Sequence, residues 1–589
     1  MSEEKEGNAV SAEELWQAWR EDDRLEAALR SELEALIAAK RLDDLRDRFV
    51  QDLAFGTGGM RARLGAGINR MNVHTVRRAT WAVAMWLADK HPDKRKLVIG
   101  YDGRHQSREF AEAAAQVAAA SGVEAVIYRW PRPTPYLSFA VRHLGCGAGV
   151  MITASHNPPE YNGYKVYGAD GGQILNDDAQ AIERLMHGQA DVFAVPYLSP
   201  QSPEFAKLVA ETDAALEEAY LREIVPLHGL ASDAEKAGLR IVYTPLHGTG
   251  AETVPEALRR AGFANVITVP EQMTLDPDFS DTKSPNPEEE VAYERALEVA
   301  REVSADIILA TDPDTDRVGV MARGANGAYQ LLSGNDVGGL ALDFYLGALR
   351  GSGQLPADGR VVTTIVTSDF GAMVAASYGV ATERTLTGFK YIGDKIGEYE
   401  RQGTGSFVFG YEESVGYLAL PIVRDKDAVQ AAVLMASMAA NCKRRYGDLL
   451  AGRGALFEKF GHFRDKLFGY TFTGVSGIEQ MQNFLNELRE RPPVAAGVDL
   501  VASEDYVSRQ RVEAATGRVT ALTLPEADVI KLFYQGGSWM AVRPSGTEPK
   551  LKVYLGAKGD RAEEAERALT ALEAAFAERI RPFLEREST

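Results

Sequence analysis

The sequence predicts an α/β protein of four domains, in which three related α/β domains with mixed sheets precede a C-terminal α+β domain. The main observation is a unit of an apolar strand, a polar or glycine-containing loop, an alanine-rich helix and a glycine, which occurs three times. The segment after about Leu456 lacks this unit. A length of 589 residues also suits about four domains better than one core.

The segment before the first unit is predicted to be helical. Residues 13–51 are rich in charge and carry apolar side chains at helical spacing, among them Leu15, Trp16, Trp19, Leu25, Ala28, Leu29 and Leu33. We therefore expect amphipathic helices here and take residues 1–50 as an N-terminal helical extension.

The three repeated units have the same order of elements. In the first unit the strand lies at 97–101, the helix at 111–115 and the segment that begins with glycine at 122–128. In the second unit the corresponding ranges are 239–243, 255–258 and 262–267. In the third unit the strand lies at 361–366, the helix at 372–376 and the glycine at 379. A second strand follows clearly in the first two units only. Because such units place their functional loops at the ends of strands, chemistry is expected there.

The C-terminal segment predicts a different domain. It has a loop at Arg543 between two strands and ends in an amphipathic helix from Arg561 to Ile580. Strands without the repeated unit, followed by a helix, favour an α+β domain.

Composition limits the possible partners and location. With 45% hydrophobic and 25% charged residues, the chain has the composition of an ordinary globular protein. It has no apolar run of membrane-spanning length and begins with the acidic stretch 1–6, so we expect a cytoplasmic protein without a membrane partner. A net charge of −19 argues against nucleic acid, but it leaves room for a small anion bound in a locally positive cleft. The two cysteines, Cys146 and Cys442, predict neither a disulfide framework nor a zinc site.

A serine follows the apolar run 149–152 in the segment Thr-Ala-Ser-His-Asn-Pro-Pro, residues 153–159. The Asn-Pro-Pro forces a sharp exit from regular structure, which holds Ser155 at the end of a strand. A capped turn would use the same residues, so this loop alone does not define a site. Ser155 is a candidate phosphate carrier.

Three carboxylates at alternate positions follow the apolar strand 305–311. Asp312, Asp314 and Asp316 would repel one another unless a cation lay among them. Oxygen ligands without Cys or His favour Mg²⁺ over Zn²⁺. An EF-hand loop needs Gly at its sixth and Glu at its twelfth position, where this chain has Arg317 and Arg323.

Two further loops suit a sugar phosphate. Residues 410–417, Gly-Tyr-Glu-Glu-Ser-Val-Gly-Tyr, place carboxylates that accept hydrogen bonds from hydroxyls beside aromatic rings. Residues 543–550 combine a guanidinium, hydroxyls and a glycine, which is the composition of a phosphate cradle made by Arg543, Ser545, Gly546 and Thr547.

These four loops, in this order, resemble those of the α-D-phosphohexomutase superfamily, and most of all its long bacterial phosphoglucomutase branch, which includes relatives that act on pentose phosphates. The resemblance runs from the Phe-Gly-Thr-Gly-Gly-Met-Arg segment at 55–61 to residue 554. It implies four domains around a central cleft, each contributing one loop. The expected domains are 51–207, 208–326, 327–455 and 456–589.

The resemblance also implies an isomerase that moves a phosphoryl group between two hydroxyls of one sugar. A phosphorylated Ser155 would donate its phosphate to the free hydroxyl and take back the other, through glucose 1,6-bisphosphate if the sugar is glucose. Mg²⁺ would be bound by the three aspartates and a phosphate oxygen on Ser155, while the Arg543 loop would hold the second phosphate. The partners are then sugar phosphates, and the sequence leaves open whether the protein is a monomer or a dimer.

Several other residues match positions near the substrate of the family. Arg61 and Lys165 match positions beside the reactive phosphate, and one or both could take part in proton transfer, with His156 as a further candidate. Lys165 would need a depressed pKa to act as a base, and Arg61 is better suited to stabilising charge. The implied substrate-binding residues are Arg317, Thr387, Gly388, Lys390, Glu412 and Ser414, with His247 as a secondary candidate.

Two positions depart from the family pattern, one in the turn after Arg61 and one after the segment expected to bind the sugar. Ala62 follows Arg61 where Gly is common, and Gly416 and Tyr417 stand where some phosphomannomutases carry a histidine. The second departure argues against a proton shuttle by a histidine at positions 416–417 and against a preference for mannose. Phosphopentomutase or phosphomannomutase activity remains an alternative, as does a sugar-phosphate sensor without catalysis, which would be expected to lack one of the catalytic groups.

Overall fold

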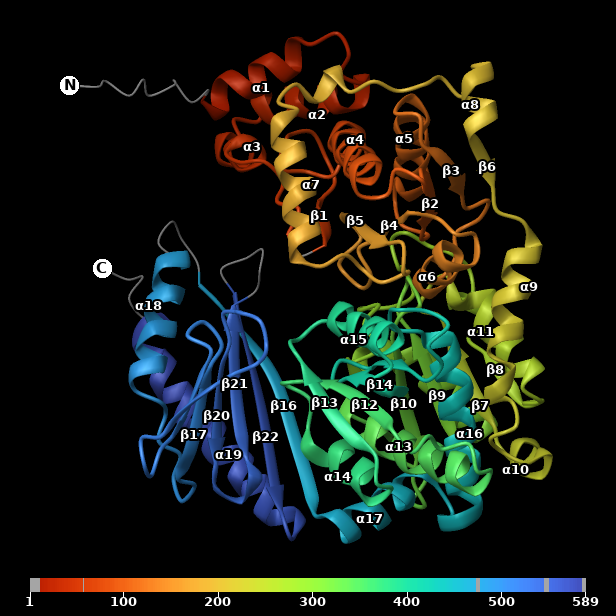
Figure 1. Ribbon diagram of the computed structural model, residues 1–589, viewed down its shortest axis with the longest axis vertical. Coiled ribbons are helices and arrows are strands. Elements are labelled where there is room, and N and C mark those ends of the chain that lie inside the picture. Colours follow the sequence, from red (N-terminus) through yellow and green to blue (C-terminus); the bar gives the residue numbers. More distant parts are fainter. Residues whose placement is uncertain (1–10, 57, 473–476, 545–549, 585–589) are drawn as a thin grey trace.

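The structure is a computed structural model that describes residues 11–56, 58–472, 477–544 and 550–584. Within these residues the strands form four sheets, which follow one another along the chain and are covered by helices (Figure 1). The first three sheets are mixed and the fourth is antiparallel. This is the four-domain α/β architecture that the sequence predicts.

Three helices precede the first sheet, as expected, and pack around Trp16, Trp19, Leu33 and Phe49. Ser11 begins the first of them with a capping box that includes Glu14. These helices are α1 (Ala12–Glu21), α2 (Ala27–Ala38) and α3 (Leu42–Phe49).

The first domain has a six-stranded sheet in the order β1-β5-β4-β2-β3-β6, where β2, β3, β4 and β6 are parallel. The repeated unit at 97–128 becomes β2, α5 and β3. The strands are β1 (Gly59–Arg63), β2 (Lys96–Tyr101), β3 (Glu124–Ile127), β4 (Ala148–Ile152), β5 (Tyr161–Gly168) and β6 (Val209–Glu211). The helices are α4 (Val73–Lys90), α5 (Ser107–Ala120), α6 (Thr134–His143), α7 (Asn176–Gly188), the 3₁₀ turn η1 (Val192–Ala194) and α8 (Pro203–Leu208).

The second domain has a five-stranded sheet in the order β11-β10-β9-β7-β8. The second repeated unit becomes β7, α11 and β8, and its two strands are parallel. The strands are β7 (Ile241–Thr244), β8 (Val266–Thr268), β9 (Ile307–Thr311), β10 (Val318–Arg323) and β11 (Tyr329–Leu331). The helices are α9 (Ala214–Glu223), η2 (Val225–Leu227), α10 (Asp233–Ala237), α11 (Gly250–Arg260), η3 (Pro270–Gln272), η4 (Glu290–Tyr293) and α12 (Glu294–Val303).

The third domain has a four-stranded sheet in the order β13-β12-β14-β15. Helix α16, which is buried along most of its length, packs against both α11 and α13 and so joins the second and third domains. The strands are β12 (Gly359–Thr364), β13 (Ala381–Thr385), β14 (Ser406–Glu412) and β15 (Gly416–Leu418). The helices are α13 (Gly334–Gly351), α14 (Asp369–Ser377), α15 (Phe389–Gln402), α16 (Ala428–Tyr446) and α17 (Leu449–Phe460).

The fourth domain is a seven-stranded antiparallel sheet in the order β16-β22-β21-β20-β17-β18-β19. Helices α18 and α19 share a separate apolar core with this sheet. The strands are β16 (His462–Thr471), β17 (Leu500–Asp505), β18 (Gln510–Glu513), β19 (Val519–Ala521), β20 (Ile530–Tyr534), β21 (Trp539–Pro544) and β22 (Lys550–Gly559). The helices are α18 (Gly477–Glu490), η5 (Gln535–Gly537) and α19 (Ala562–Leu584).

Two of the expected domain boundaries need a small correction. Strand β6 pairs with β3 in the first sheet although it follows residue 207, and β11 pairs with β10 in the second sheet although it follows residue 326. Each sheet therefore takes a last short edge strand from beyond the expected boundary.

None of the helices in the described residues is long and apolar enough to cross a membrane.

Candidate active site

Ser155 lies at the turn that follows β4 and is 4% exposed. Its backbone has φ of +52°, which is uncommon for a residue other than glycine, and its N–H donates to Thr153 Oγ1 at 2.9 Å. The hydroxyl donates to Asp312 Oδ2 at 2.6 Å and lies 3.2 Å from His156 Nδ1. The serine loop of the first domain thus meets the acidic loop of the second.

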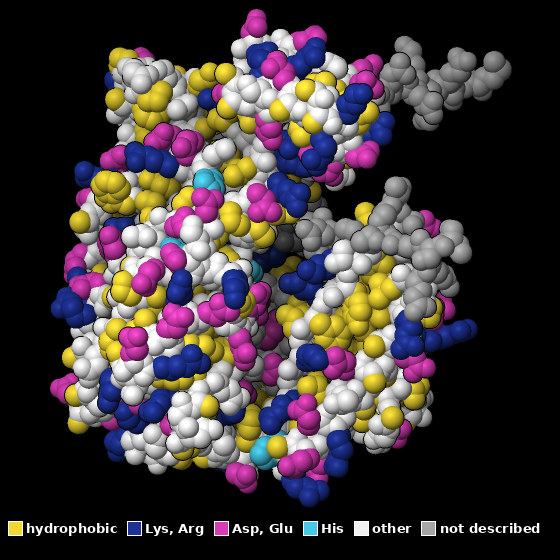
Figure 2. Space-filling view, turned by 180° about the vertical axis from the view of Figure 1, so that it is seen from behind, with side chains coloured by type: hydrophobic (Ala, Val, Ile, Leu, Met, Phe, Trp, Pro, Cys, Tyr) yellow, Lys and Arg dark blue, Asp and Glu magenta, His cyan; other side chains and the backbone are white. Residues whose placement is uncertain are grey.

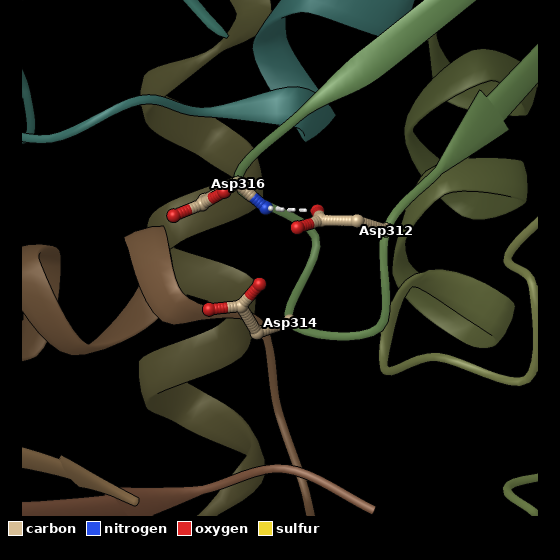
Figure 3. Close-up of side chains that lie close together, drawn as sticks. All are labelled: Asp312, Asp314 and Asp316. Carbon is tan, nitrogen blue, oxygen red and sulfur yellow. Dashed lines mark hydrogen bonds between the residues drawn. The ribbon is translucent and has the colours of Figure 1, made fainter. Parts of the chain in front are cut away.

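Asp312, Asp314 and Asp316 lie in the turn between β9 and β10, and all three are buried. One carboxylate oxygen from each lies within 4.8 Å of the others. In Figure 3 the three carboxylates lie around one space, and Asp312 accepts the backbone N–H of Asp316 at 3.1 Å. Burial and the neighbouring carboxylates raise the pKa of Asp312 well above its usual value, so a cation here would be favoured.

Lys165 supplies positive charge to this cluster from β5. Its Nζ lies 3.0 Å from Asp314 Oδ2 and 3.7 Å from Asp316 Oδ2. Burial alone would lower the pKa of Lys165, but the two aspartates raise it overall. The depressed pKa that a lysine base requires is therefore absent, and Lys165 is a cation in this structure.

His156 and Arg61 complete the surroundings of the serine. Burial, and then Arg317 and Arg61, lower the pKa of His156 well below its usual value, so its ring is neutral near pH 7. Arg61, on β1, is exposed to solvent and donates to Asn157 Oδ1 at 3.1 Å. A neutral imidazole therefore belongs to the serine loop, and a guanidinium from β1 contacts that loop.

The third domain contributes Glu412, the last residue of β14. Its Oε1 accepts the N–H of Gly388 at 2.9 Å, which fixes the segment before α15. Burial, and then Glu412 itself, raise the pKa of the neighbouring Glu413 to about 7. This pair of carboxylates consequently repels an anion less near neutral pH than two ordinary glutamates would.

Arg317 links the second and third domains. Its Nη1 donates to Glu288 Oε1 at 2.7 Å and to the carbonyl oxygen of Ser414 at 3.1 Å. The N–H of Val318 also donates to the carbonyl of Val415 at 3.0 Å. The turn with the three aspartates and the segment 410–417 are thus joined by hydrogen bonds from the Arg317 side chain and the Val318 backbone.

The fourth domain contributes Arg543 at the end of β21. Its Nε donates to the hydroxyl of Tyr554 at 3.3 Å, and its guanidinium lies 5.9 Å from the centre of that ring. Lys552 pairs with Arg543 across β21 and β22 and adds a second cation. The other expected members of this loop, Ser545, Gly546 and Thr547, lie outside the described residues.

The four loops meet in one cleft of about 530 Å³. Figure 2 shows the hollow between the first and fourth domains, with Lys and Arg side chains at its edge. The expected residues that line the cleft are Arg61, Ser155, His156, Lys165, Asp316, Arg317, Thr387, Gly388, Glu412, Ser414 and Arg543. Asp312 and Asp314 lie buried beside it.

Two expected substrate-binding residues do not line this cleft. His247 is buried at 3% exposure, where Nδ1 bonds the carbonyl of Thr274 at 3.0 Å and Nε2 accepts the N–H of Asp281 at 3.4 Å. Lys390 donates to Asn176 Oδ1 at 2.8 Å, at the start of α7. In this structure both side chains hold parts of the fold together.

Lys426 is a cleft residue that the sequence analysis missed. Its Nζ lies 3.1 Å from Asp316 Oδ2 and 3.1 Å from Asp425 Oδ1, and it faces the ring of Phe389 at 5.6 Å. It fits because position 416 is glycine, where a Cβ would lie 2.3 Å from Lys426 Cδ. No local signal marks Lys426, since its partners come from other segments.

Comparisons with known families match part or most of each of the four domains. The family described as phosphoglucomutase/phosphomannomutase, alpha/beta/alpha domain I, matches residues 52–192, domain II matches 218–325 and domain III matches 333–455. The C-terminal domain of the same family matches 500–574.

Individual relatives agree over most of their length. The chain is 38% identical to phosphoglucomutase of Staphylococcus haemolyticus, covering 88% of this chain and 92% of the relative. It is 34% identical to phosphoglucomutase of Staphylococcus aureus strain MSSA476, covering 87% of this chain and 91% of that relative. A putative phosphomannomutase from Thermus thermophilus has the same fold, with a TM-score of 0.66 at 23% identity over 90% of this chain and 99% of that one. The open form of parafusin, a phosphoglucomutase from Paramecium, has a TM-score of 0.65 at 16% identity, covering 91% of this chain and 96% of that one.

Proposed function

Since the chain belongs to the phosphoglucomutase/phosphomannomutase family, we propose that it is a phosphoglucomutase that interconverts α-D-glucose 1-phosphate and glucose 6-phosphate. The observation that carries this function is the position of the Ser155 hydroxyl, 2.6 Å from a buried carboxylate and in the same cleft as Arg543. One end of the cleft can then hold a reactive phosphate and the other a phosphate that is only bound.

The three aspartates fit a divalent metal ion. Asp314 Oδ1 and Asp316 Oδ1 are buried without a hydrogen-bond partner, which is costly unless a ligand satisfies them. A set of carboxylate oxygens is the donor set that Mg²⁺ prefers. We assign Asp312, Asp314 and Asp316 as its ligands, together with a phosphate oxygen on Ser155. When bound, Mg²⁺ would neutralise charge on the phosphoryl oxygens during transfer.

In the transfer step, the bond between phosphorus and Ser155 Oγ breaks as a bond to the free hydroxyl oxygen of the sugar forms. The sugar hydroxyl loses a proton and the serine oxygen gains one, so the step is balanced without another reactant. Neutral His156, whose Nδ1 lies 3.2 Å from Oγ, is suited to relay this proton. Lys165 and Arg61 are cations that stabilise the charge on the phosphoryl group.

The second step needs the bisphosphate to turn end for end, so that its other phosphate reaches Ser155. Arg543 and Lys552 suit the phosphate that is not reacting, because a guanidinium can hold two phosphate oxygens at once. Glu412 and Ser414 also line the cleft and suit the sugar hydroxyls. The intermediate is glucose 1,6-bisphosphate for a glucose substrate.

The sugar is tested by a coupled assay on glucose 1-phosphate, mannose 1-phosphate and ribose 1-phosphate with excess Mg²⁺. We expect glucose 1-phosphate to give the highest kcat/KM, in keeping with the name of the relatives at 34–38% identity. A preference for ribose or mannose 1-phosphate would reassign the chain to phosphopentomutase or phosphomannomutase activity. Binding without turnover of any of the three would show a sensor instead.

A further inference from the structure

The Arg104 side chain donates hydrogen bonds to the backbone of the loop that carries Ser155. The side chain is buried at 4% exposure, and its Nη2 donates to the carbonyl of Ser155 at 2.6 Å and to that of Asn157. Its Nη1 donates to the carbonyls of Pro158 and Tyr161 at 3.0 and 3.1 Å. One guanidinium therefore binds four backbone carbonyls of residues 155–161.

This loop needs such support, since it contains few backbone hydrogen bonds of its own. Ser155 has a positive φ, and Pro158 and Pro159 cannot donate. Arg suits the role better than Lys because its planar fork presents several donors in fixed directions. These contacts hold the backbone of the loop from which the Ser155 side chain projects.

Arg104 is itself held by both the first and the second domain. Asp102 Oδ1 accepts the backbone N–H of Arg104 at 3.0 Å and the hydroxyl of Ser107 at 2.7 Å. From the second domain, the ring of Phe279 lies 5.0 Å from the guanidinium carbon and is 4% exposed. Beside it, Asp278 bonds His105 at 2.7 Å.

The segment that carries Phe279 is anchored in the second domain. His247 bonds it at Thr274 and at Asp281, on either side of Phe279. The same domain carries Asp312, which accepts the Ser155 hydroxyl. A continuous set of contacts therefore joins the placement of the serine to the domain that holds the carboxylates.

We propose that Arg104 is a positioning residue that holds Ser155 in line with the carboxylates of the second domain, and that Phe279 keeps Arg104 in place across the domain boundary. This inference rests on the proposed function. Reacting groups that come from two domains must stay within hydrogen-bond distance, and a displacement of about 1 Å can cost on the order of 100-fold in rate.

The test compares Arg104→Lys and Phe279→Leu with wild type by steady-state kinetics on glucose 1-phosphate and by hydrogen exchange of the peptide covering 153–161. Arg104→Lys should lower kcat at least about tenfold with KM changed less than about threefold. Phe279→Leu should lower kcat about threefold. Exchange in 153–161 should be faster in both variants.

Arg30→Lys is the matched control, because Arg30 also holds backbone carbonyls, those of Arg20, Asp22 and Leu25, among the N-terminal helices. It should leave kcat and exchange in 153–161 unchanged. If Arg104→Lys does not fold, the kinetics and hydrogen exchange of Phe279→Leu test the proposal. Wild-type exchange in 153–161, or a kcat within about twofold of wild type, would overturn the proposal. Absence of turnover by wild type would instead contradict the proposed function, while the exchange comparison would still test Arg104.

Discussion

The Ser155 hydroxyl donates a 2.6 Å hydrogen bond to Asp312 Oδ2, although the two residues are 157 positions apart in sequence. The serine lies in the turn after a strand of the first sheet, and the aspartate follows a strand of the second. Neither domain alone contains both the proposed phosphate carrier and the proposed metal ligands. Catalysis on this account depends on how the two domains are held together.

Removing one carboxylate from the acidic cluster should abolish metal-dependent turnover. Asp314→Ala removes a proposed metal ligand whose Oδ1 has no hydrogen-bond partner, together with the bonds that its Oδ2 accepts from Thr134 and Lys165. We expect kcat to fall on the order of 100-fold or more, with a circular dichroism spectrum like that of wild type. Turnover is measured over a Mg²⁺ titration. Full activity of the variant, or of wild type in excess chelator, would contradict the metal assignment.

Replacing the guanidinium of the fourth domain should weaken substrate binding. Arg543→Lys keeps one positive charge but loses the fork that holds two phosphate oxygens. We expect KM for glucose 1-phosphate to rise about tenfold, with a smaller change in kcat, because this phosphate does not react in the first step. Steady-state kinetics measures both. A drop in kcat at constant KM would place Arg543 at the reacting phosphate instead.

Adding a methyl group at position 416 should disturb Lys426. In Gly416→Ala, the new Cβ would lie 2.3 Å from Lys426 Cδ, so the lysine must leave its place beside Asp316. A fall in kcat/KM of about tenfold is expected, since a cation is displaced from the cleft. Gly454→Ala, on α17, is the control, because no atom lies within 4 Å of its added Cβ. Equal activity of the two variants would argue against a role for Lys426.

Stability should depend on pH through Asp465 at the border of the third and fourth domains. Burial, and then Asp336, raise the pKa of Asp465 from 3.8 to about 6. Ionising this group therefore costs more in the folded than in the unfolded protein, and wild type loses stability as pH rises from about 4 to about 6.

Asp465→Asn cannot ionise, so it should be more stable than wild type by about 3 kcal/mol above pH 6 and no more stable below about pH 4. Urea unfolding at pH 4 and pH 8 measures this difference. Asp89→Asn, at an exposed position of α4, serves as the control. A stabilisation that is the same at both pH values would contradict the assignment.

The strands that lead into the site could be predicted from the sequence, since apolar runs such as 149–152 and 305–311 end directly at polar loops. Strand β13 was missed because its residues, Ala-Thr-Glu-Arg-Thr, are mostly polar and it lies, mostly half-buried, at the edge of its sheet. An edge strand of this kind lacks the apolar pattern that marks a buried one.

The contacts between domains could not be predicted. Arg104 stands in an Asp-Gly-Arg segment that looks like an ordinary turn, and its partners lie more than fifty positions further along the chain. Lys426 likewise gains its role only when Asp316 is brought beside it. His247 and Lys390 were expected in the cleft from their neighbours in sequence, yet their side chains bond to other segments.

Ser155 is proposed to carry the phosphoryl group, and intact mass spectrometry after incubation with glucose 1,6-bisphosphate tests this role most directly. Wild type should gain about 80 Da, the mass of one phosphoryl group, and Ser155→Ala should gain nothing and lose mutase turnover. The gain should persist during turnover of glucose 1-phosphate with Mg²⁺, because the second step returns a phosphoryl group to Ser155. Equal mutase turnover by Ser155→Ala would contradict the account.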